Sequence, residues 1–337
     1  LDSLNCVDYL CFGCETDSID LLNTVAEILI NEPKEYKDLL TINLKTGISF
    51  PKARAKALDE YFKKYNLDYS LDINSKKYAK YHSDITSNSN LDINTFINQP
   101  NNILGIEYIK ALMRFNSKIN PVPLKRLGAG YHSLDTRTKL ASATGIRTAI
   151  ANKDNISGLL PDNCLNIIKN HTTIEYNDFS TVLGSKLLSM DTLDHIEGIN
   201  QDLSNRIANN KYNFTDIETF MPMLQSKNYT YSAISRALLH IILDIKTDGL
   251  KEFISNNYVN YAMILGFNKN TGVLSEISKS TKIPLVSKFA TFYKEADNNQ
   301  RKMLDINLKA DNLYRMIYMN KTSETLPTEF QRQIIIK

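Results

Sequence analysis

The sequence predicts an α/β fold with a doubly wound parallel sheet, followed by a mainly helical part that contains a small α/β unit. In residues 1–155, short apolar segments alternate with amphipathic helical segments, an order that favours parallel strand pairing. After about residue 155 the helical period dominates. Short apolar segments return only between residues 258 and 286. We therefore expect two domains, 1–155 and 156–337.

The first predicted strand covers Cys6 to Phe12, and we expect it to be buried. Gly13 follows at its carboxyl end, the edge where open α/β sheets bind ligands. A glycine there lets a ligand approach the backbone, although a glycine required only by the turn is an open alternative. A helix is predicted from Asp17 to Ile30. Its apolar face holds Ile19, Leu22, Val25, Ile28 and Leu29.

A second helix is predicted to start in the segment Gly47–Pro51, because proline is tolerated in a first helical turn. Residues 66–99 are polar and rich in Asn and Ser, so we predict a loop with one short helix near Lys76–Tyr81. The inner face of the second helix is predicted to hold Ala53, Ala57, Leu58, Tyr61 and Phe62.

A third helix is predicted from Pro100 to Phe115. Asn101 and Asn102 stand at its start, and an Asn side chain either caps a helix or contacts a ligand with its donor and acceptor groups. Capping is the commoner use, but two adjacent Asn residues leave one for a ligand. The inward positions are predicted to be Ile106, Ile109, Leu112 and Met113.

The strand Asn120–Leu127 is predicted to lead through a polar loop to an abrupt helix start at Ser142. Thr144 and Arg147 lie near this positive helix end, where unpaired N–H groups and the helix dipole favour anions. Arg126 at the strand end supplies a second positive charge. An ordinary capped helix after a loop is the plainer alternative. The buried face of this helix is predicted to hold Ile146, Ala149 and Ile150.

In the second part, Thr215–Glu218 has the pattern of a capping box, and Thr230 is predicted to cap a strongly amphipathic helix. Arg236 and His240, four residues apart, share the outer face of that helix. This pair either contacts phosphate or forms a solvated face. The small α/β unit is predicted as a strand Tyr258–Phe267, a helix Gly272–Ser280 and a strand Ile283–Val286.

The composition favours a soluble, cytoplasmic protein. Of the 337 residues 42% are hydrophobic, but no apolar run approaches the roughly 18 residues that a membrane span needs. The four cysteines show no disulfide framework. The pair Cys11 and Cys14 has CxxC spacing without a second pair, so two small apolar residues at a strand end are favoured over a redox pair or a zinc site.

The charge is unevenly placed along the chain. The net charge is +3, whereas residues 227–337 hold 16 Lys and Arg against 10 Asp and Glu. This excess of +6 indicates that the C-terminal half binds a polyanion. A solvated Lys-rich surface is the alternative, and charge alone favours it.

No catalytic residue and no metal site can be named from spacing. The five histidines show no metal-ligand spacing, and no paired carboxylates or Ser-His-Asp arrangement are evident. His132 lies in the loop beside Arg126, where a histidine is more often a hydrogen-bonding loop residue than a catalyst. The five histidines are His82, His132, His171, His195 and His240.

The segment Ser142–Arg147 resembles the second signature of the HIGH-motif nucleotidyltransferase superfamily, a Ser/Thr-rich turn followed by Ile-Arg. More of the chain resembles one member, the bacterial tRNA(Met) cytidine acetate ligase family. The matching segments recur in family order to about residue 290. They are Cys11–Glu15, Gly47–Arg54, Gln99–Tyr108, Arg126–Leu127 with Tyr131–His132, Ser235–His240 and Ile283–Lys288.

This resemblance implies a partial Rossmann-like nucleotidyltransferase domain and a tRNA-binding second domain. The family activates acetate with ATP to acetyl-adenylate and acetylates N4 of the wobble cytidine of elongator tRNA(Met). Mg²⁺ is expected with ATP, without a ligand that we can name. Arg236 and His240 are the residues expected to contact tRNA. The residues that the resemblance places at ATP are Gly13, Asn101, Arg126, Leu127, Ser142, Thr144 and Arg147.

The family's His-rich phosphate loop, of the form His-x-Gly-His, does not occur in the 337 residues. We therefore expect that this stretch of chain does not form acetyl-adenylate by itself. Two alternatives remain. One is another small-molecule nucleotidyltransferase that does not act on RNA, and the other is a non-catalytic RNA-binding protein with a degenerate nucleotide site.

Overall fold

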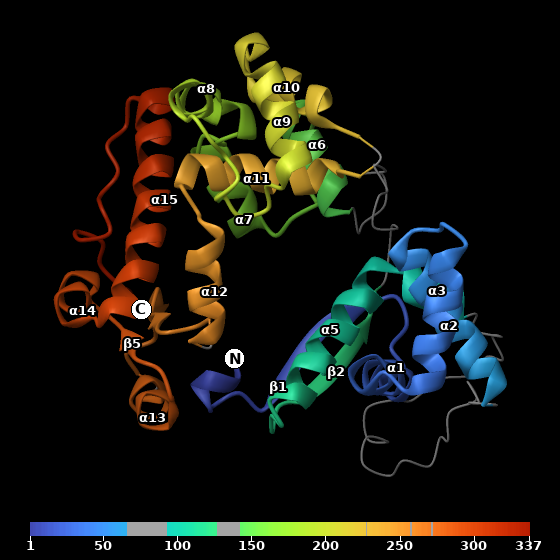
Figure 1. Ribbon diagram of the computed structural model, residues 1–337. Helices are drawn as coiled ribbons and strands as arrows, with labels where there is room; N and C mark the ends of the chain where they lie inside the picture. The colour runs from blue at the N-terminus through green and yellow to red at the C-terminus, as the bar shows by residue number, and fades with distance from the viewer. Residues whose placement is uncertain (66–92, 127–141, 227, 257, 271) are drawn as a thin grey trace. The chain divides into compact units, whose positions relative to one another are not determined.

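The computed structural model describes residues 1–65, 93–126, 142–226, 228–256, 258–270 and 272–337 (Figure 1). The chain divides into two compact units. Unit 1 comprises Leu1–Asp2 and Cys6–Asp162, and unit 2 comprises Ser3–Asn5 and Asn163–Lys337. The predicted domain boundary at residue 155 falls inside unit 1, seven residues before its end at Asp162.

The sheet of unit 1 is a parallel pair formed by β1 (Tyr9–Cys14) and β2 (Asn120–Lys125). Their register runs from Tyr9 opposite Asn120 to Cys14 opposite Lys125, so the carboxyl ends of both strands emerge at one edge. The backbone N–H groups of Asn120 and Arg126 donate to the carbonyls of Asp8 and Cys14, 2.8 Å away in both cases. Parallel pairing is thus confirmed.

The N–H groups of β2 alternate between the β1 side and the opposite side. Those of residues 120 and 126 point toward β1, so positions 121 and 123 point away. Both of these outward positions are prolines, Pro121 and Pro123, which have no N–H to donate. The prolines are therefore compatible with this strand only because they lie on the edge that faces away from β1.

The prediction of a buried first strand over Cys6–Phe12 was wrong in both position and burial. The strand begins three residues later, and only Phe12 and Cys14 are buried. Tyr9 and Cys11 are exposed, because successive side chains of a strand point to opposite faces and only one face joins the hydrophobic core.

Six helices of unit 1 are described. The predicted first, second and third helices are confirmed, each to within a few residues, and Ser18 caps the first by accepting from Leu21 N at 3.3 Å. Met113, predicted to face inward, is 40% exposed. The helices are α1 (Ile19–Asn31), α2 (Lys34–Lys45), α3 (Phe50–Lys64), α4 (Ile93–Asn98), α5 (Pro100–Arg114) and α6 (Ala143–Ala151).

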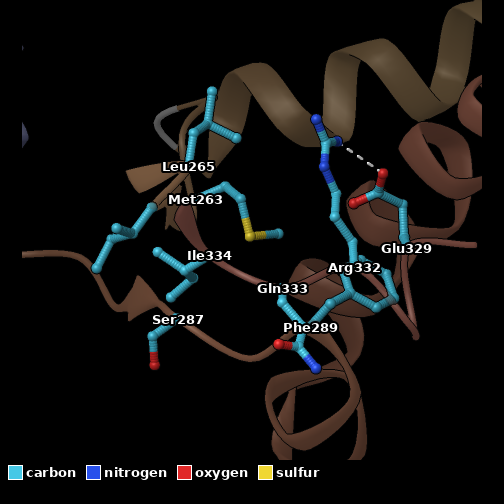
Figure 2. A pocket seen from close by; sticks show the side chains of 9 residues that line it. Met263, Leu265, Ser287, Phe289, Glu329, Arg332, Gln333 and Ile334 are labelled. Carbon is cyan, nitrogen blue, oxygen red and sulfur yellow. Dashed lines mark hydrogen bonds and ion pairs between the residues drawn. The ribbon is translucent and has the colours of Figure 1, made fainter. Parts of the chain in front are cut away.

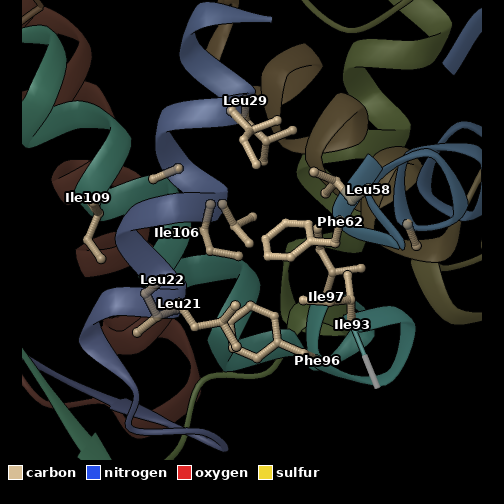
Figure 3. Close-up of a cluster of buried hydrophobic side chains, with 14 of the residues drawn as sticks. Leu21, Leu22, Leu29, Leu58, Phe62, Ile93, Phe96, Ile97, Ile106 and Ile109 are labelled. Carbon is tan, nitrogen blue, oxygen red and sulfur yellow. The ribbon is translucent and has the colours of Figure 1, made fainter. Parts of the chain in front are cut away.

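Helix α4 corrects the predicted loop over residues 66–99, because Ile93, Phe96 and Ile97 are buried and fold residues 93–98 into the core. The short helix predicted near Lys76–Tyr81 lies outside the described residues. Figure 3 shows side chains from α1, α3, α4 and α5 converging in this core. Helix α5 also packs closely on β1, since a Cβ at Gly105 would stand 2.5 Å from Phe12 Cε2.

Unit 2 is mainly helical, as predicted, with a core formed chiefly by α8 to α11. Short 3₁₀ segments of this unit are Tyr176–Phe179 and Lys211–Asn213, and a third, Asp2–Leu4, begins at the last residue of the first segment of unit 1. The helices are α7 (Asp162–Asn170), α8 (Ser180–Ser189), α9 (Gln201–Asn210), α10 (Ile217–Leu224), α11 (Tyr231–Leu243), α12 (Thr247–Ser255), α13 (Val273–Ser280), α14 (Phe289–Glu295) and α15 (Asn298–Thr322).

Helix starts in unit 2 follow the capping signals only in part. Thr230 caps α11, as predicted, by accepting from Ala233 N at 3.3 Å. The capping box predicted over Thr215–Glu218 was wrong. Asp216 is the cap of α10 and its Oδ1 accepts from Thr219 N at 2.9 Å, so the helix begins one residue later than the pattern indicated.

The small α/β unit contains two separate parallel pairs. β3 (Ala262–Met263) pairs with β5 (Leu285–Val286), and β4 (Gly266–Phe267) pairs with β6 (Ile335–Ile336). The single strand predicted over Tyr258–Phe267 was therefore wrong, because the chain changes its pairing partner between β3 and β4. The helix predicted over Gly272–Ser280 is confirmed as α13, and no described helix is long and apolar enough to cross a bilayer.

Candidate functional site

Gly13 and Arg126 meet at the carboxyl edge of the β1–β2 pair. The Arg126 side chain lies over Gly13, where an added Cβ would stand 3.3 Å from Arg126 Cγ. The glycine does not adopt a left-handed φ, so a tight turn is not the reason for its presence. The missing side chain makes room for the stem of Arg126, and the guanidinium group is carried on an exposed side chain at this edge.

Hydrogen bonds join the end of β1 to the start of α5, and we call this set the strand–helix junction. Glu15 accepts from both neighbouring asparagines. Its Oε1 lies 2.6 Å from Asn101 Nδ2, and its Oε2 lies 3.1 Å from the backbone N of Asn102. Gln99 occupies the N-cap position of α5 without a side-chain capping bond, so the Glu15 carboxylate satisfies one of the free N–H groups at the helix start.

Asn102 is the structural member of the asparagine pair. It is completely buried, and its Oδ1 accepts from the backbone N of Glu15 at 3.0 Å and of Thr16 at 3.1 Å. Its Nδ2 donates to Phe96 O at 3.1 Å and Gln99 Oε1 at 2.7 Å. Because both ends of this amide are used within the protein, Asn101, which is half-buried, is the asparagine that can face a ligand.

Cys11 and Cys14 do not form a redox pair in this arrangement. Three residues apart on one strand, they point to opposite faces of the sheet, and only Cys14 is buried. Its thiol donates to the carbonyl of Leu124 at 3.6 Å. Burial, together with the negative charges of Asp17 and Glu15, raises the pKa of Cys14 to about 11, so the thiol is protonated at neutral pH.

The predicted anion-binding helix start exists as α6. Ser142 is buried at the N-cap and its Oγ accepts from Gly145 N at 3.0 Å. Thr144 is half-buried in the first turn, and Arg147 is exposed. The position of this helix start relative to Arg126 depends on residues 127–141, which lie outside the described part of the chain, as do Leu127 and His132.

The predicted tRNA-contacting pair is only partly exposed. Arg236 is exposed on α11, but His240 is half-buried, and its Nδ1 lies 2.7 Å from the carbonyl oxygen of Glu197. Of the two residues predicted on the outer face, His240 is only partly exposed, because the segment before α9 packs over this turn of the helix.

The basic excess does not extend over unit 2 as a whole. Residues 163–226 hold 4 Lys and Arg against 8 Asp and Glu, opposite in sign to the 16 against 10 in residues 227–337. Positive charge is therefore concentrated from Lys227 onward rather than throughout the unit.

Neither of two cavities in the described part of unit 2 is lined by a predicted site residue. The larger, about 250 Å³, lies between α15 and the segment after it, and burial together with Glu329 raises the pKa of Asp311 on its wall. The smaller is shown in Figure 2, where Arg332 pairs with Glu329 at 2.8 Å. Within the described ranges, no group of three His, Cys, Asp or Glu side chains could hold a metal ion.

Glu15 belongs to the strand–helix junction, but the sequence analysis did not identify it as a site residue. The signal was available, since a carboxylate directly follows the strand end and closes the segment Cys11–Glu15. Its partner asparagines lie 86 and 87 residues away, a separation that no local pattern connects.

Comparisons with known proteins agree on one family. The sequence pattern described as HIGH Nucleotidyl Transferase matches residues 1–329. The chain is 32% identical over 330 residues to the tRNA(Met) cytidine acetate ligase of Thermoanaerobacter sp. (strain X514), covering 96% of this chain and 75% of that protein. The enzyme of the same name from Clostridium perfringens (strain ATCC 13124) is 31% identical, with 94% and 73% covered.

Solved structures share the fold. The crystal structure of apo Thermotoga maritima TmcAL matches with a TM-score of 0.81 at 24% identity, covering all of this chain and 78% of that one. A second structure of the same protein, bound with alpha-thio ATP, matches equally well. The predicted fold class, a partial Rossmann-like α/β domain followed by a mainly helical part, is confirmed.

Proposed function

The chain belongs to the tRNA(Met) cytidine acetate ligase family of HIGH nucleotidyl transferases, and from that premise we propose that it serves ATP-dependent acetylation of a tRNA cytidine. In this proposal acetate and ATP form acetyl-adenylate, and the acetyl group then passes to N4 of the wobble cytidine of elongator tRNA(Met). The family resemblance of the Cys11–Glu15 and Gln99–Tyr108 segments supports this assignment.

The observation that carries the proposal is the placement of Arg126 over Gly13 at the carboxyl edge of the parallel strands. This is the edge at which open α/β sheets bind nucleotides. An Arg side chain held there provides a fixed fork of N–H donors for phosphate oxygens. The Ser142–Arg147 helix start is proposed to contact the same phosphates through its free N–H groups and Arg147.

Adenylate formation requires in-line attack of an acetate oxygen on the α-phosphorus of ATP, with pyrophosphate as the leaving group. The proposed task of the named residues is therefore to orient the triphosphate and to stabilise the negative charge that develops on it. Mg²⁺ is expected to accompany the triphosphate. The described residues offer no ready-made set of ligands for it, so we assign it no residue.

The second proposed partner is tRNA(Met), with binding attributed to the positively charged region from Lys227 onward and to Arg236. We do not propose that His240 Nδ1 contacts tRNA, because this ring nitrogen already contacts the carbonyl oxygen of Glu197.

The proposal is tested with the full-length protein, including any residues encoded upstream of Leu1, and in parallel with the 337-residue chain. Labelled acetate, ATP and tRNA(Met) are incubated, and acetylcytidine is quantified by mass spectrometry of the digested tRNA. The full-length protein is expected to form acetylcytidine only when ATP is present. Tight tRNA binding without acetylation would favour a non-catalytic RNA-binding protein, and ATP turnover without tRNA binding would favour another nucleotidyltransferase.

A further inference from the structure

Asn101 is held in one orientation by Glu15. The distance of 2.6 Å between Asn101 Nδ2 and Glu15 Oε1 is short for an amide–carboxylate bond. The same carboxylate is fixed from its other oxygen by the backbone N of Asn102. Asn102 in turn is buried and bonded at both ends of its amide, so the platform under Asn101 is rigid.

The chemistry of this contact decides which end of the Asn101 amide faces Glu15 and which end faces away from it. A carboxylate has no hydrogen to donate, so the group that approaches Glu15 Oε1 must be the amide nitrogen. The amide oxygen of Asn101 is then directed away from Glu15. An amide oxygen accepts hydrogen bonds and donates none.

We propose that Glu15 is a positioning residue that turns the amide oxygen of Asn101 toward a neutral N–H or O–H donor of the bound nucleoside. This inference rests on the proposed function and assigns Asn101 to the nucleoside rather than to the phosphates. Phosphate oxygens are hydrogen-bond acceptors, so they cannot form a hydrogen bond with an amide oxygen, which is also an acceptor. The Glu15 carboxylate beside it also repels them.

Two donors of ATP fit this chemistry, the exocyclic amino group of adenine and the ribose hydroxyls. At the carboxyl edge of the β1–β2 pair, the positively charged Arg126 side chain then binds the triphosphate, and Asn101, held by Glu15, binds the nucleoside. Thus nucleoside selection would depend on a residue that does not itself touch the ligand.

The experiment measures nucleotide affinities by calorimetry on the full-length protein, including any residues encoded upstream of Leu1. The nucleotides are ATP, ITP, in which a carbonyl replaces the amino group, and 2′-deoxy and 3′-deoxy ATP. One analogue is expected to bind about tenfold or more weakly than ATP, because it leaves the Asn101 oxygen without its donor. ITP identifies the base amino group, and a deoxy analogue identifies a ribose hydroxyl.

Glu15→Gln leaves one acceptor oxygen for two donors, Asn101 Nδ2 and the backbone N of Asn102, so the Asn101 amide is no longer held in one orientation. The ratio of the affinity for ATP to the affinity for the analogue is therefore expected to fall toward one. Asn101→Ala is expected to do the same, and the double variant to add nothing further. Glu15→Asp keeps the negative charge, but its side chain is one methylene shorter, so the carboxylate lies farther from Asn101. This variant replaces Glu15→Gln in the experiment if Glu15→Gln does not fold. Asp17→Asn, a nearby carboxylate that makes no contact with Asn101 in the described structure, is the matched control and should preserve the ratio.

A Glu15→Gln protein that loses affinity for all nucleotides equally would overturn the inference, since a merely structural carboxylate would behave in this way. Equal binding of all analogues by the unmutated protein would overturn it as well. Failure of the unmutated protein to bind ATP would overturn the proposed function and this inference with it.

Discussion

Arg126 is the residue on which nucleotide binding is predicted to depend most directly. A charge-assisted contact between Arg and phosphate contributes roughly 1.5–3 kcal/mol, so Arg126→Ala should weaken ATP binding by about ten- to a hundredfold. Calorimetric titration of the full-length protein, including any residues encoded upstream of Leu1, measures this effect.

Lys125→Ala removes the adjacent exposed positive charge and is the matched control, with a much smaller expected effect. Arg126→Lys keeps the charge but not the planar fork, and it should fall between the two. An unchanged ATP affinity in Arg126→Ala would mean that Arg126 serves only to pack over Gly13.

Cys14 gives a prediction about alkaline stability. Its pKa is raised from 9.0 to about 11 in the folded protein, chiefly by burial. The folded state therefore holds this proton more tightly than the unfolded chain. The resulting stabilisation is complete below pH 9 and is lost as the pH rises from 9 through 11.

Urea unfolding of Cys14→Ala and the unmutated chain at pH 8 and pH 10.5 isolates this contribution. The variant should lose less stability than the unmutated chain over that interval, because buried tyrosines such as Tyr36 titrate in both proteins. A parallel decline of the two proteins would show that the thiol does not contribute.

Residue types at the site were largely predictable, but their partners were not. The pattern after β1 placed Gly13 at a sheet edge, yet Arg126, which occupies the space beside it, lies 113 residues further along the chain. His240 was misjudged for the same reason, since spacing on a helix shows which face a residue takes but not which loop covers that face.

At the scale of single elements, the cap of α6 gives a prediction about helix stability. Ser142 is buried and accepts from Gly145 N, and losing such a cap typically costs about 1 kcal/mol. Ser142→Ala should therefore lower the free energy of unfolding by about this amount. Chemical denaturation measures it, with Thr230→Ala at the cap of α11 as the comparison.

The same variant separates the two roles proposed for Ser142. If the hydroxyl only caps the helix, ATP affinity should change little once the loss of stability is considered. A large loss of ATP affinity with unchanged stability would instead assign Ser142 to the ligand and contradict the capping account.

Long amphipathic elements were predictable because their signal is local. Helices α1 and α11 follow the apolar period and a capping residue, and α5 follows the apolar period after Pro100. All three were located from the sequence. Strands β3 and β4 were not, because each is two residues long and is defined by a distant partner. The pairing between Gly266 and Ile335, for example, cannot be recognised from the residues around either position.

For the whole molecule, the concentration of positive charge from Lys227 onward predicts salt-dependent tRNA binding. Phosphate contacts release counterions, so the affinity should fall steeply with salt concentration. If Arg236 contacts a phosphate, Arg236→Ala should reduce the slope of log affinity against log salt by about one unit. Filter binding at several salt concentrations measures the slope.

Arg206→Ala is the matched control for this experiment. Arg206 is paired with Asp202 at 3.2 Å and lies in the acidic part of unit 2, so its removal should leave the slope unchanged. Equal slopes for both variants and the unmutated protein would exclude Arg236 from the phosphate contacts.

The two prolines of β2 have a consequence for how the protein behaves in concentrated solution. A bare strand edge invites another chain to add to it, and such additions begin aggregates. Pro121 and Pro123 remove two successive outward donors from β2, so an incoming strand could not form a complete set of backbone hydrogen bonds on this side. We therefore expect that copies of the chain do not associate by adding strands to the outward side of β2.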